Sequence, residues 1–243
     1  MKEISVAEQI VSEAKRLVVF TGAGVSADSG VPTFRGAAGD ALWGKYDPRQ
    51  LASPQGFRAD PKLVYEWYTW RRSQLAKVEP NAGHRVIARW QERGAVVVTQ
   101  NVDGLHERCA PPGVVIYRLH GTLGEDRCST CEHREDLDLN NLPGLRGCPA
   151  CGEWMRPAVV WFGEALEPEV WRGAKKAIQS ADALVVVGTS GEVYPAAGLV
   201  ELAASAGAKV IVVNLEKGPL DDLATVVLHG RAAEVLPQID RAD

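Results

Sequence analysis

Five short runs of apolar residues, rich in Val and Ile, constrain the fold of this chain more than any other feature. They lie at residues 17–20, 95–98, 114–117, 184–187 and 210–213. Each run is continuous rather than alternating, which is typical of strands buried on both faces of a parallel sheet. Stretches with helical character separate the runs, at residues 82–93, 168–180 and 196–206. This alternation predicts a doubly wound α/β fold with a Rossmann-like parallel sheet.

Each of the five runs opens into small, polar residues. These loops are residues 21–26, 99–104, 118–121, 188–190 and 214–216. In open α/β sheets, ligands bind outside the carboxyl ends of the strands. The repeated layout therefore predicts a ligand site at one edge of the sheet.

Length and charge exclude several classes of protein. A chain of 243 residues with 46% hydrophobic and 24% charged residues is an ordinary globular chain, with one large domain or one domain and a small insert. The net charge of −4 argues against a general attraction to nucleic acid or to an anionic membrane. No apolar run approaches the roughly 20 residues that span a bilayer, and the first ten residues lack the apolar core of a secretory signal. We expect a cytoplasmic monomer with no membrane partner and no specific nucleic-acid partner.

Four of the five cysteines form two Cys-x-x-Cys pairs, inside a polar stretch at residues 126–153 that is predicted to be a small inserted module. They are Cys128, Cys131, Cys148 and Cys151. This spacing is typical of a tetrahedral zinc site with four thiolates, and the alternative is two disulfides. Four thiolates leave no position open for substrate, so the predicted zinc is structural. Cys109 is left unpaired, and His133 lies inside the module as an alternative ligand.

Residues 22–27 fit the pattern G-x-G-x-x-A that follows a strand in dinucleotide-binding folds. Glycines there let the backbone approach a pyrophosphate, and a helix N-terminus favours its negative charge. The match is weak alone, because Gly-rich turns between strands and helices are common. The acidic residue expected some 20 residues further on is absent. Glu216 is a substitute that binds the adenosine ribose, or simply a capping or surface carboxylate.

Two other strand ends each allow two interpretations. Gln100, Asn101 and Asp103 place two amides and a carboxylate in one loop, which suits either a carboxamide or sugar ligand, or an Asx-turn that serves only the backbone. His120 follows a strand and precedes Gly121. A lone histidine is more often a packed core residue, but the four other polar strand ends beside it favour a general base.

A helix is predicted to begin at Asp60 as N-cap, with Pro61 at its first position. Tyr68 and Arg71 then lie three residues apart on one face. A phenol beside a guanidinium binds a carboxylate well. From the residues alone, a half-buried tyrosine beside a solvated arginine is the favoured interpretation.

Together these motifs resemble those of the sirtuin family of NAD-dependent protein lysine deacylases. The motifs are residues 22–36, 99–106, 120–121, 157–164, 188–190 and 214–216, together with the four-cysteine module. The resemblance implies a single catalytic domain over residues 1–243. A large NAD-binding lobe would comprise about residues 1–30, 82–125 and 155–243. A small lobe would comprise about residues 31–81 and the zinc module at 126–153.

The resemblance implies that NAD lies across the strand ends. It makes His120, Asn101 and Asp103 the catalytic residues, with His120 as the general base and Asn101 and Asp103 at the nicotinamide and its ribose. The products are free lysine, nicotinamide and O-acyl-ADP-ribose. The NAD-binding residues that it implies are Gly22, Ala23, Gly24, Ser26, Thr33, Phe34, Arg35, Gln100, Asn101, Asp103, Gly188, Thr189, Ser190, Asn214, Leu215, Glu216 and Ala232.

Many sirtuins have an Asp where this chain has Thr33, and the class III branch resembles this chain there and in the Tyr68–Arg71 pair. In that branch the pair recognises the carboxylate of succinyl-, malonyl- or glutaryl-lysine, and a small residue, here Ala37, leaves room for the acyl chain. This implies a desuccinylase and demalonylase that also removes acetyl groups, acting on acylated-lysine proteins or peptides. The residues implied to hold the peptide are Val160, Trp161, Phe162, Gly163, Glu192, Val193 and Tyr194.

Two other functions remain open at this point. A mono-ADP-ribosyltransferase would use the same NAD site with a different acceptor. A binding module without activity would be an NAD sensor or a zinc-ribbon nucleic-acid binder. The ribbon is disfavoured, because residues 126–153 are not strongly basic and lack interleaved aromatics.

Overall fold

The computed structural model describes residues 2–32 and 47–240. Six strands form a parallel sheet in the order β3-β2-β1-β7-β8-β9. Their bounds are β1 Leu17–Thr21, β2 Val96–Thr99, β3 Ile116–Arg118, β7 Ala183–Val187, β8 Lys209–Asn214 and β9 Val226–His229. This confirms the predicted doubly wound fold. The strand order reverses between β1 and β7, and ligands of such sheets bind at this switch point.

The predicted strands differ from the observed ones in two places. The third apolar run was expected at 114–117, but β3 begins only at Ile116, and Val115 before it is 46% exposed. The sixth strand, β9, was not predicted at all. It pairs with β8 from Ile211↔Val226 to Asn214↔His229 and closes that edge of the sheet.

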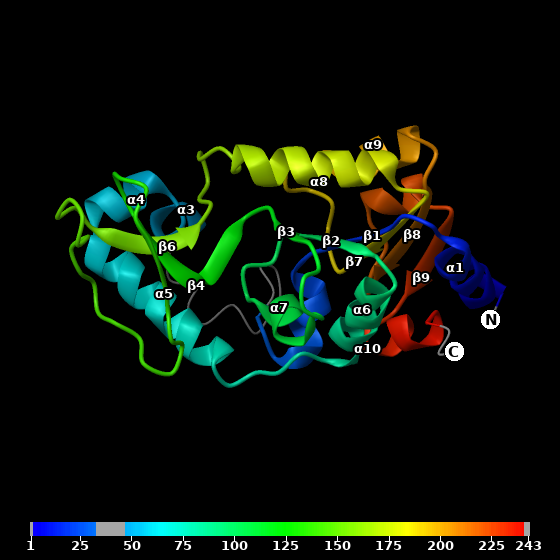
Figure 1. Cartoon of the computed structure of the whole chain (residues 1–243), viewed down its shortest axis with the longest axis horizontal. Coiled ribbons are helices and arrows are strands. Elements are labelled where there is room, and N and C mark those ends of the chain that lie inside the picture. The colour runs from blue at the N-terminus through cyan, green and yellow to red at the C-terminus, as the bar shows by residue number, and fades with distance from the viewer. Residues whose placement is uncertain (1, 33–46, 241–243) are drawn as a thin grey trace.

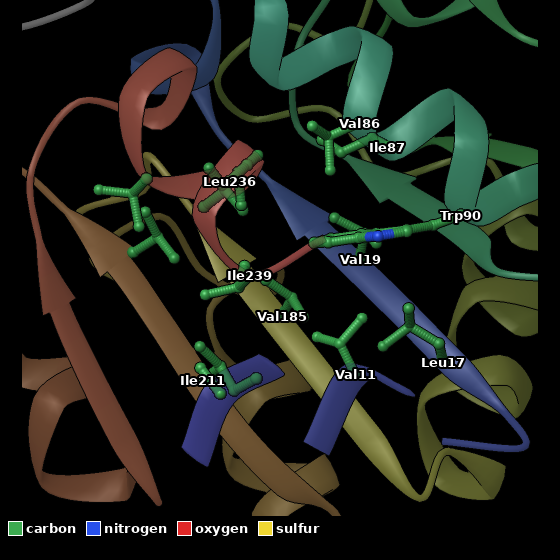
Figure 2. Close-up of a cluster of buried hydrophobic side chains, with 14 of the residues drawn as sticks. Val11, Leu17, Val19, Val86, Ile87, Trp90, Val185, Ile211, Leu236 and Ile239 are labelled. Atoms are coloured by element: carbon green, nitrogen blue, oxygen red, sulfur yellow. The ribbon is translucent and has the colours of Figure 1, made fainter. Parts of the chain in front are cut away.

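Helices cover both faces of the large sheet (Figure 1). One face carries α1 (Lys2–Glu13), α6 (Ala82–Glu92) and α10 (Ala232–Val235), and the other carries α8 (Pro168–Ser180) and α9 (Gly198–Ser205). Successive residues of β1 point to opposite faces, so Val19 packs in the first core and Val18 in the second. Figure 2 shows the first core, where Trp90 lies over Val19 and Ile239 lies beside Val185.

A second sheet of three antiparallel strands builds the other end of the molecule. It has the order β5-β4-β6, with β4 at Gly121–Cys128, β5 at Arg134–Asp136 and β6 at Met155–Val159. It therefore reaches beyond the module expected at 126–153, because β4 begins at Gly121 and β6 ends at Val159. The chain crosses from the large sheet to this one directly after His120.

Helices α3 (Pro48–Leu51), α4 (Pro54–Ala59) and α5 (Pro61–Leu75) pack on the three-stranded sheet (Figure 1). Helix α5 begins as predicted, since the Asp60 carboxylate accepts a hydrogen bond from Leu63 N over 2.9 Å. Its inward face contributes Val64, Trp67 and Tyr68 to a core shared with the strands. No helix within residues 2–32 and 47–240 has the length and apolar character of a membrane span.

Buried charges also join α5 to β4. Arg72 and Asp126 are both fully buried, and Arg72 Nη2 donates to Asp126 Oδ1 over 2.8 Å. Tyr65 Oη and Arg146 Nη1 donate to the other carboxylate oxygen, over 2.6 and 2.7 Å. Burial and the bond to Asp126 raise the pKa of Tyr65 to about 12, so it remains a donor. Each partner satisfies a charge that would otherwise be costly to bury.

Candidate functional site

Two glycine-rich loops meet at the switch point between β1 and β7. Gly22 N donates to Val187 O over 2.9 Å, and Gly24 N donates to Gly188 O over 2.8 Å. A Cβ at Gly22 would lie 2.7 Å from Gly188 O, and one at Gly24 would lie 2.7 Å from Gly188 Cα. The glycines are therefore required by contact between the two loops themselves. The segment after Gly22 is a 3₁₀ helix, η1 (Ala23–Ser29), and not the α-helix that the glycine motif suggested.

A buried polar cluster, which we call the Asp103 cluster, comprises Ser26, His84, Asn101 and Asp103. Ser26 Oγ donates to Asp103 Oδ2 over 2.8 Å, and Asn101 Nδ2 donates to Ser26 Oγ over 3.2 Å. His84 Nε2 lies 3.3 Å from the same hydroxyl. Asp103 Oδ1 also accepts from Leu105 N, as in an Asx-turn. Asp103 therefore makes the turn with one oxygen and belongs to the polar cluster with the other.

Two buried histidines also lie in this region. His84 belongs to the Asp103 cluster, and His106 Nε2 lies 2.9 Å from Thr21 Oγ1. Their rings are 4.9 Å apart, and both are buried. Burial lowers the pKa of His106 to about 4, and burial together with the charge of His106 lowers that of His84 to about 3. Both are neutral at pH 7. His84 lies on α6 and His106 on α7, so only the packing of these two helices brings the rings together. No sequence pattern predicts this contact.

His120 lies where the loops after β1, β2, β3 and β7 come together. Its Nδ1 is 3.1 Å from Gln100 O, and Gln100 N donates to Thr21 O over 2.9 Å. A carbonyl oxygen only accepts, so Nδ1 carries the proton of the neutral ring and Nε2 has a free lone pair. Burial lowers the pKa of His120, although the bond to Gln100 raises it. A neutral imidazole with an available Nε2 is suited to act as a general base.

The remaining strand ends connect to the same network through Thr189. Gln100 Nε2 donates to Thr189 Oγ1, and Asn214 Nδ2 donates to Thr189 O, each over 2.9 Å. Leu215 after β8 is 65% exposed, so an apolar side chain faces outward beside these polar groups. The donors and acceptors here are amides, hydroxyls and a carboxylate, which suit the hydroxyls and carboxamide of a dinucleotide. This donor set therefore fits NAD.

Other predicted cofactor residues fall in different surroundings. Ala23 is half-buried, and Ser190 and Glu216 are exposed. Ala232 is buried at the start of α10, where its backbone faces Gly83 of α6. Thr33, Phe34, Arg35 and Ala37 lie outside the described residues.

The structure brings Tyr68 and Arg71 together on α5 against two tryptophans. The Arg71 guanidinium carbon lies 4.9 Å from the Trp67 ring centroid and 5.6 Å from that of Tyr68. Tyr68 is 1% exposed rather than half-buried, and its hydroxyl accepts from Trp161 Nε1 over 2.9 Å. Burial raises the pKa of Tyr68 and lowers that of Arg71, which the charges of Tyr68 and Asp103 partly restore. Among the described carboxylates, none forms an ion pair with Arg71.

The segment after β6 runs from this pair to His120. Val160 N donates to His120 O, and Phe162 N donates to Ala52 O, each over 2.9 Å. Phe162, Val193 and Tyr194 are 46%, 42% and 65% exposed. Arg156 and Glu164 hold this segment in place. Arg156 pairs with Glu164 and stacks on the Trp161 ring, and Glu164 accepts a hydrogen bond from Trp161 N. No sequence pattern predicted these contacts.

The four predicted zinc ligands converge, as Cys128, Cys131, Cys148 and Cys151 place their sulfurs within 4.8 Å of one another. Tetrahedral zinc with bonds of about 2.3 Å places sulfurs about 3.8 Å apart. The Cys131–Cys148 and Cys128–Cys151 pairs are 3.7 and 3.4 Å apart, too far for disulfides. Backbone N–H groups of Thr130 and Ala150 point at sulfurs of the cluster. These residues fit one structural zinc ion. His133 is not a ligand and binds Glu135 instead.

Comparison with known proteins places this arrangement in a family. The family model described as "Sir2 family" matches residues 22–195. An "NAD-dependent protein deacylase" of Mycolicibacterium paratuberculosis is 50% identical over 91% of this chain and 95% of its own. A crystal structure of a Sir2 homologue–NAD complex superposes with a TM-score of 0.90, at 40% identity, covering 98% of this chain and 92% of that one. The structure of Sir2Af2 bound to a myristoylated histone peptide has a TM-score of 0.77 at 34% identity and covers 98% and 94% of the two chains. The chain therefore belongs to the Sir2 family, the sirtuins.

Proposed function

We propose that this chain removes acyl groups from protein lysines in an NAD-dependent reaction, releasing nicotinamide and O-acyl-ADP-ribose. The observation that carries the proposal is the position of His120. Gln100, which precedes Asn101 of the Asp103 cluster, holds Nδ1 of the ring and so leaves Nε2 unprotonated where the strand-end loops meet. The deacylase relative, the NAD complex and the acyl-peptide complex described above support the same reaction.

When bound, NAD supplies the ribose that accepts the acyl group and the nicotinamide that leaves. Asn101 and Asp103 hold the ribose hydroxyls, since their side chains are fixed by Ser26 and the Asx-turn. His120 Nε2 takes a proton from a ribose hydroxyl, while Gln100 O keeps the ring in the required tautomer. The peptide adds as a strand between residues 160–164 and 192–194, because main-chain pairing gives affinity with little sequence demand.

The preferred acyl groups in this proposal are succinyl and malonyl, with acetyl also removed. Tyr68 and Arg71 offer a hydroxyl and a guanidinium from adjacent turns of α5, and no described carboxylate pairs with Arg71. Arg71 is half-buried, and a guanidinium that is partly shielded from water gains most from an anionic partner, which the terminal carboxylate of an acyl chain would supply. Ala37 is proposed to leave space for this chain.

The test uses mass spectrometry of matched acetyl-lysine and succinyl-lysine peptides, with and without NAD. We expect NAD-dependent loss of both groups, with succinyl removed faster. Arg71→Gln should lower kcat/KM for the succinyl peptide about 10- to 100-fold, the worth of a charge-assisted hydrogen bond, and leave acetyl removal nearly unchanged.

Arg172→Gln is the matched control, because Arg172 is an exposed arginine on α8 that pairs with Glu169. Equal losses on both peptides in Arg71→Gln would overturn the acyl preference. ADP-ribose attached to a peptide that keeps its acyl group would favour the mono-ADP-ribosyltransferase and overturn the deacylase.

We further place the protein in the cytoplasm as a monomer without a nucleic-acid partner. Four of its five cysteines converge as metal ligands and not as disulfides, a use of cysteine that is typical of cytosolic proteins. Light scattering coupled to size exclusion tests the monomer, with a mass near 26.2 kDa as the expected result.

A further inference from the structure

One hydrogen bond restricts the groups to which the Tyr68 hydroxyl can donate. Trp161 Nε1 lies 2.9 Å from Tyr68 Oη, and an indole N–H can only donate. The Arg71 guanidinium, also near this hydroxyl, has donors alone. Tyr68 therefore accepts from Trp161, and neither Trp161 nor Arg71 can accept its own proton. Among the described residues, no acceptor takes that proton.

Trp161 is itself held on two sides. The Arg156 guanidinium carbon lies 3.9 Å from the centroid of the Trp161 ring, in a stacked contact. Arg156 Nη2 donates to Glu164 Oε1 over 2.6 Å, and Trp161 N donates to Glu164 Oε2 over 2.8 Å. Arg156 is 3% exposed, and this pairing satisfies its buried charge. The arrangement fixes both the face and the backbone of Trp161, and so the direction of its N–H.

The proposed substrate requires hydrogen-bond donors at the end of its acyl chain. An ionised carboxylate only accepts hydrogen bonds, so a residue that recognises it must donate. A tyrosine hydroxyl turns freely to suit its surroundings, and with an acceptor beside it the proton would point away from the substrate. With only donors from Trp161 and Arg71 beside it, the hydroxyl keeps its proton available for a carboxylate.

We propose that Trp161, held by Arg156 and Glu164, is a positioning residue that sets acyl selectivity by keeping Tyr68 a donor toward the terminal carboxylate of the acyl chain. This inference rests on the proposed function. It concerns succinyl- and malonyl-lysine and not acetyl-lysine, which has no carboxylate in its acyl group.

The experiment measures kcat/KM for three peptides that carry succinyl-, butyryl- and acetyl-lysine. Butyryl has the same carbon chain length as succinyl without the carboxylate. In Trp161→Phe we expect succinyl removal to fall about 5-fold relative to butyryl, which is about 1 kcal/mol of transition-state binding. Loss of pocket shape alone would lower succinyl and butyryl together. The matched control is Trp90→Phe, which removes an indole hydrogen bond to Asp240 in the large lobe.

A double-mutant cycle separates the two proposals. Tyr68→Phe should lower the succinyl-to-butyryl ratio, and adding Trp161→Phe should lower it no further, since the hydroxyl that Trp161 orients is gone. If Tyr68→Phe lowers the ratio and Trp161→Phe does not, this inference is wrong and the acyl preference stands. If neither Tyr68→Phe nor Arg71→Gln changes the ratio, the acyl preference itself fails and this inference with it. Should Trp161→Phe not fold, Arg156→Lys, which loses the stacked contact, is expected to lower the ratio in the same direction, and an unchanged ratio there overturns the inference.

Discussion

At the scale of single residues, the protonation state of His120 decides whether its Nε2 can act as a base. The bond from Nδ1 to Gln100 O leaves Nε2 unprotonated only while the ring is neutral. Burial lowers the His120 pKa, which favours the neutral ring. By contrast, an exposed histidine with the ordinary pKa of about 6.5 is protonated in about half of the molecules at pH 6.5.

This gives a pH prediction for deacylation. Protonation removes the base, so kcat/KM should be constant above about pH 6.5 and fall at lower pH, with a midpoint below the ordinary histidine pKa of about 6.5. His120→Gln should lower kcat/KM by about 10²- to 10⁴-fold and remove this acid limb. His133→Gln is the control, because His133 pairs with Glu135 in the zinc module. A midpoint above pH 6.5 would contradict the role given to burial.

Residue patterns predicted local pairs and not distant ones. The spacing of Tyr68 and Arg71 placed them on one helix face, and the structure agrees. Trp161 lies 93 residues from Tyr68, and its bond to that hydroxyl forms only when β6 and α5 share a core. The periodicity of a sequence predicts neighbours within one element and not contacts between distant segments. The contact between Ser26 and His84, 58 residues apart, could not be predicted for the same reason.

At the scale of elements, strand β4 shows why part of the fold could not be predicted. Its sequence, Gly121 to Cys128, holds two glycines and three consecutive charged residues, which read as a loop. It forms a strand because Asp126 is neutralised by Arg72 and Arg146 from other segments. The five apolar runs of the large sheet needed no such partner, so sequence alone predicted them. Strand β9 is only four residues long and ends in the polar residue His229, so its apolar run was too short to be predicted as a strand.

The zinc cluster should control the stability of this second sheet alone. Cys128 ends β4 and pairs in register with Met155 of β6, so the metal ties both strands. Removing zinc leaves crowded thiols and should raise amide exchange across β4, β5 and β6, with β1, β7 and β8 still protected. Deacylation should be lost, because Val160 follows β6 directly.

Hydrogen–deuterium exchange with and without a chelator measures this, and added zinc should restore protection. Cys151→Ser should lower the zinc content, whereas Cys109→Ser should keep one zinc per chain, since Cys109 lies outside the cluster. Equal loss of protection in both sheets would show that the metal supports the whole fold.

At the scale of the whole molecule, stability depends on keeping two buried histidines neutral. The folded-state pKa values of about 3 for His84 and about 4 for His106 lie below the unfolded value of 6.5. The unfolded chain therefore binds protons that the folded chain does not. This contribution is complete above pH 6.5 and is lost as pH falls toward the folded values.

Urea unfolding at pH 7.5 and pH 5 should show the free energy of unfolding falling by about 2 kcal/mol for each histidine. His106→Gln should reduce the fall by about half, whatever its effect at pH 7.5. An unchanged difference between the two pH values in this variant would show that His106 is not the group being protonated.

The close contact of Gly22 and Gly24 with Gly188 has a consequence for engineering this protein. The surface at the switch point is built from main chain, and each of these positions lacks room for even a methyl group. Mutant libraries that vary these three positions should therefore yield mostly unfolded or rearranged proteins instead of altered cofactor preference. Useful variation belongs at the rim, where Leu215 and Glu216 are exposed and a new side chain displaces only solvent.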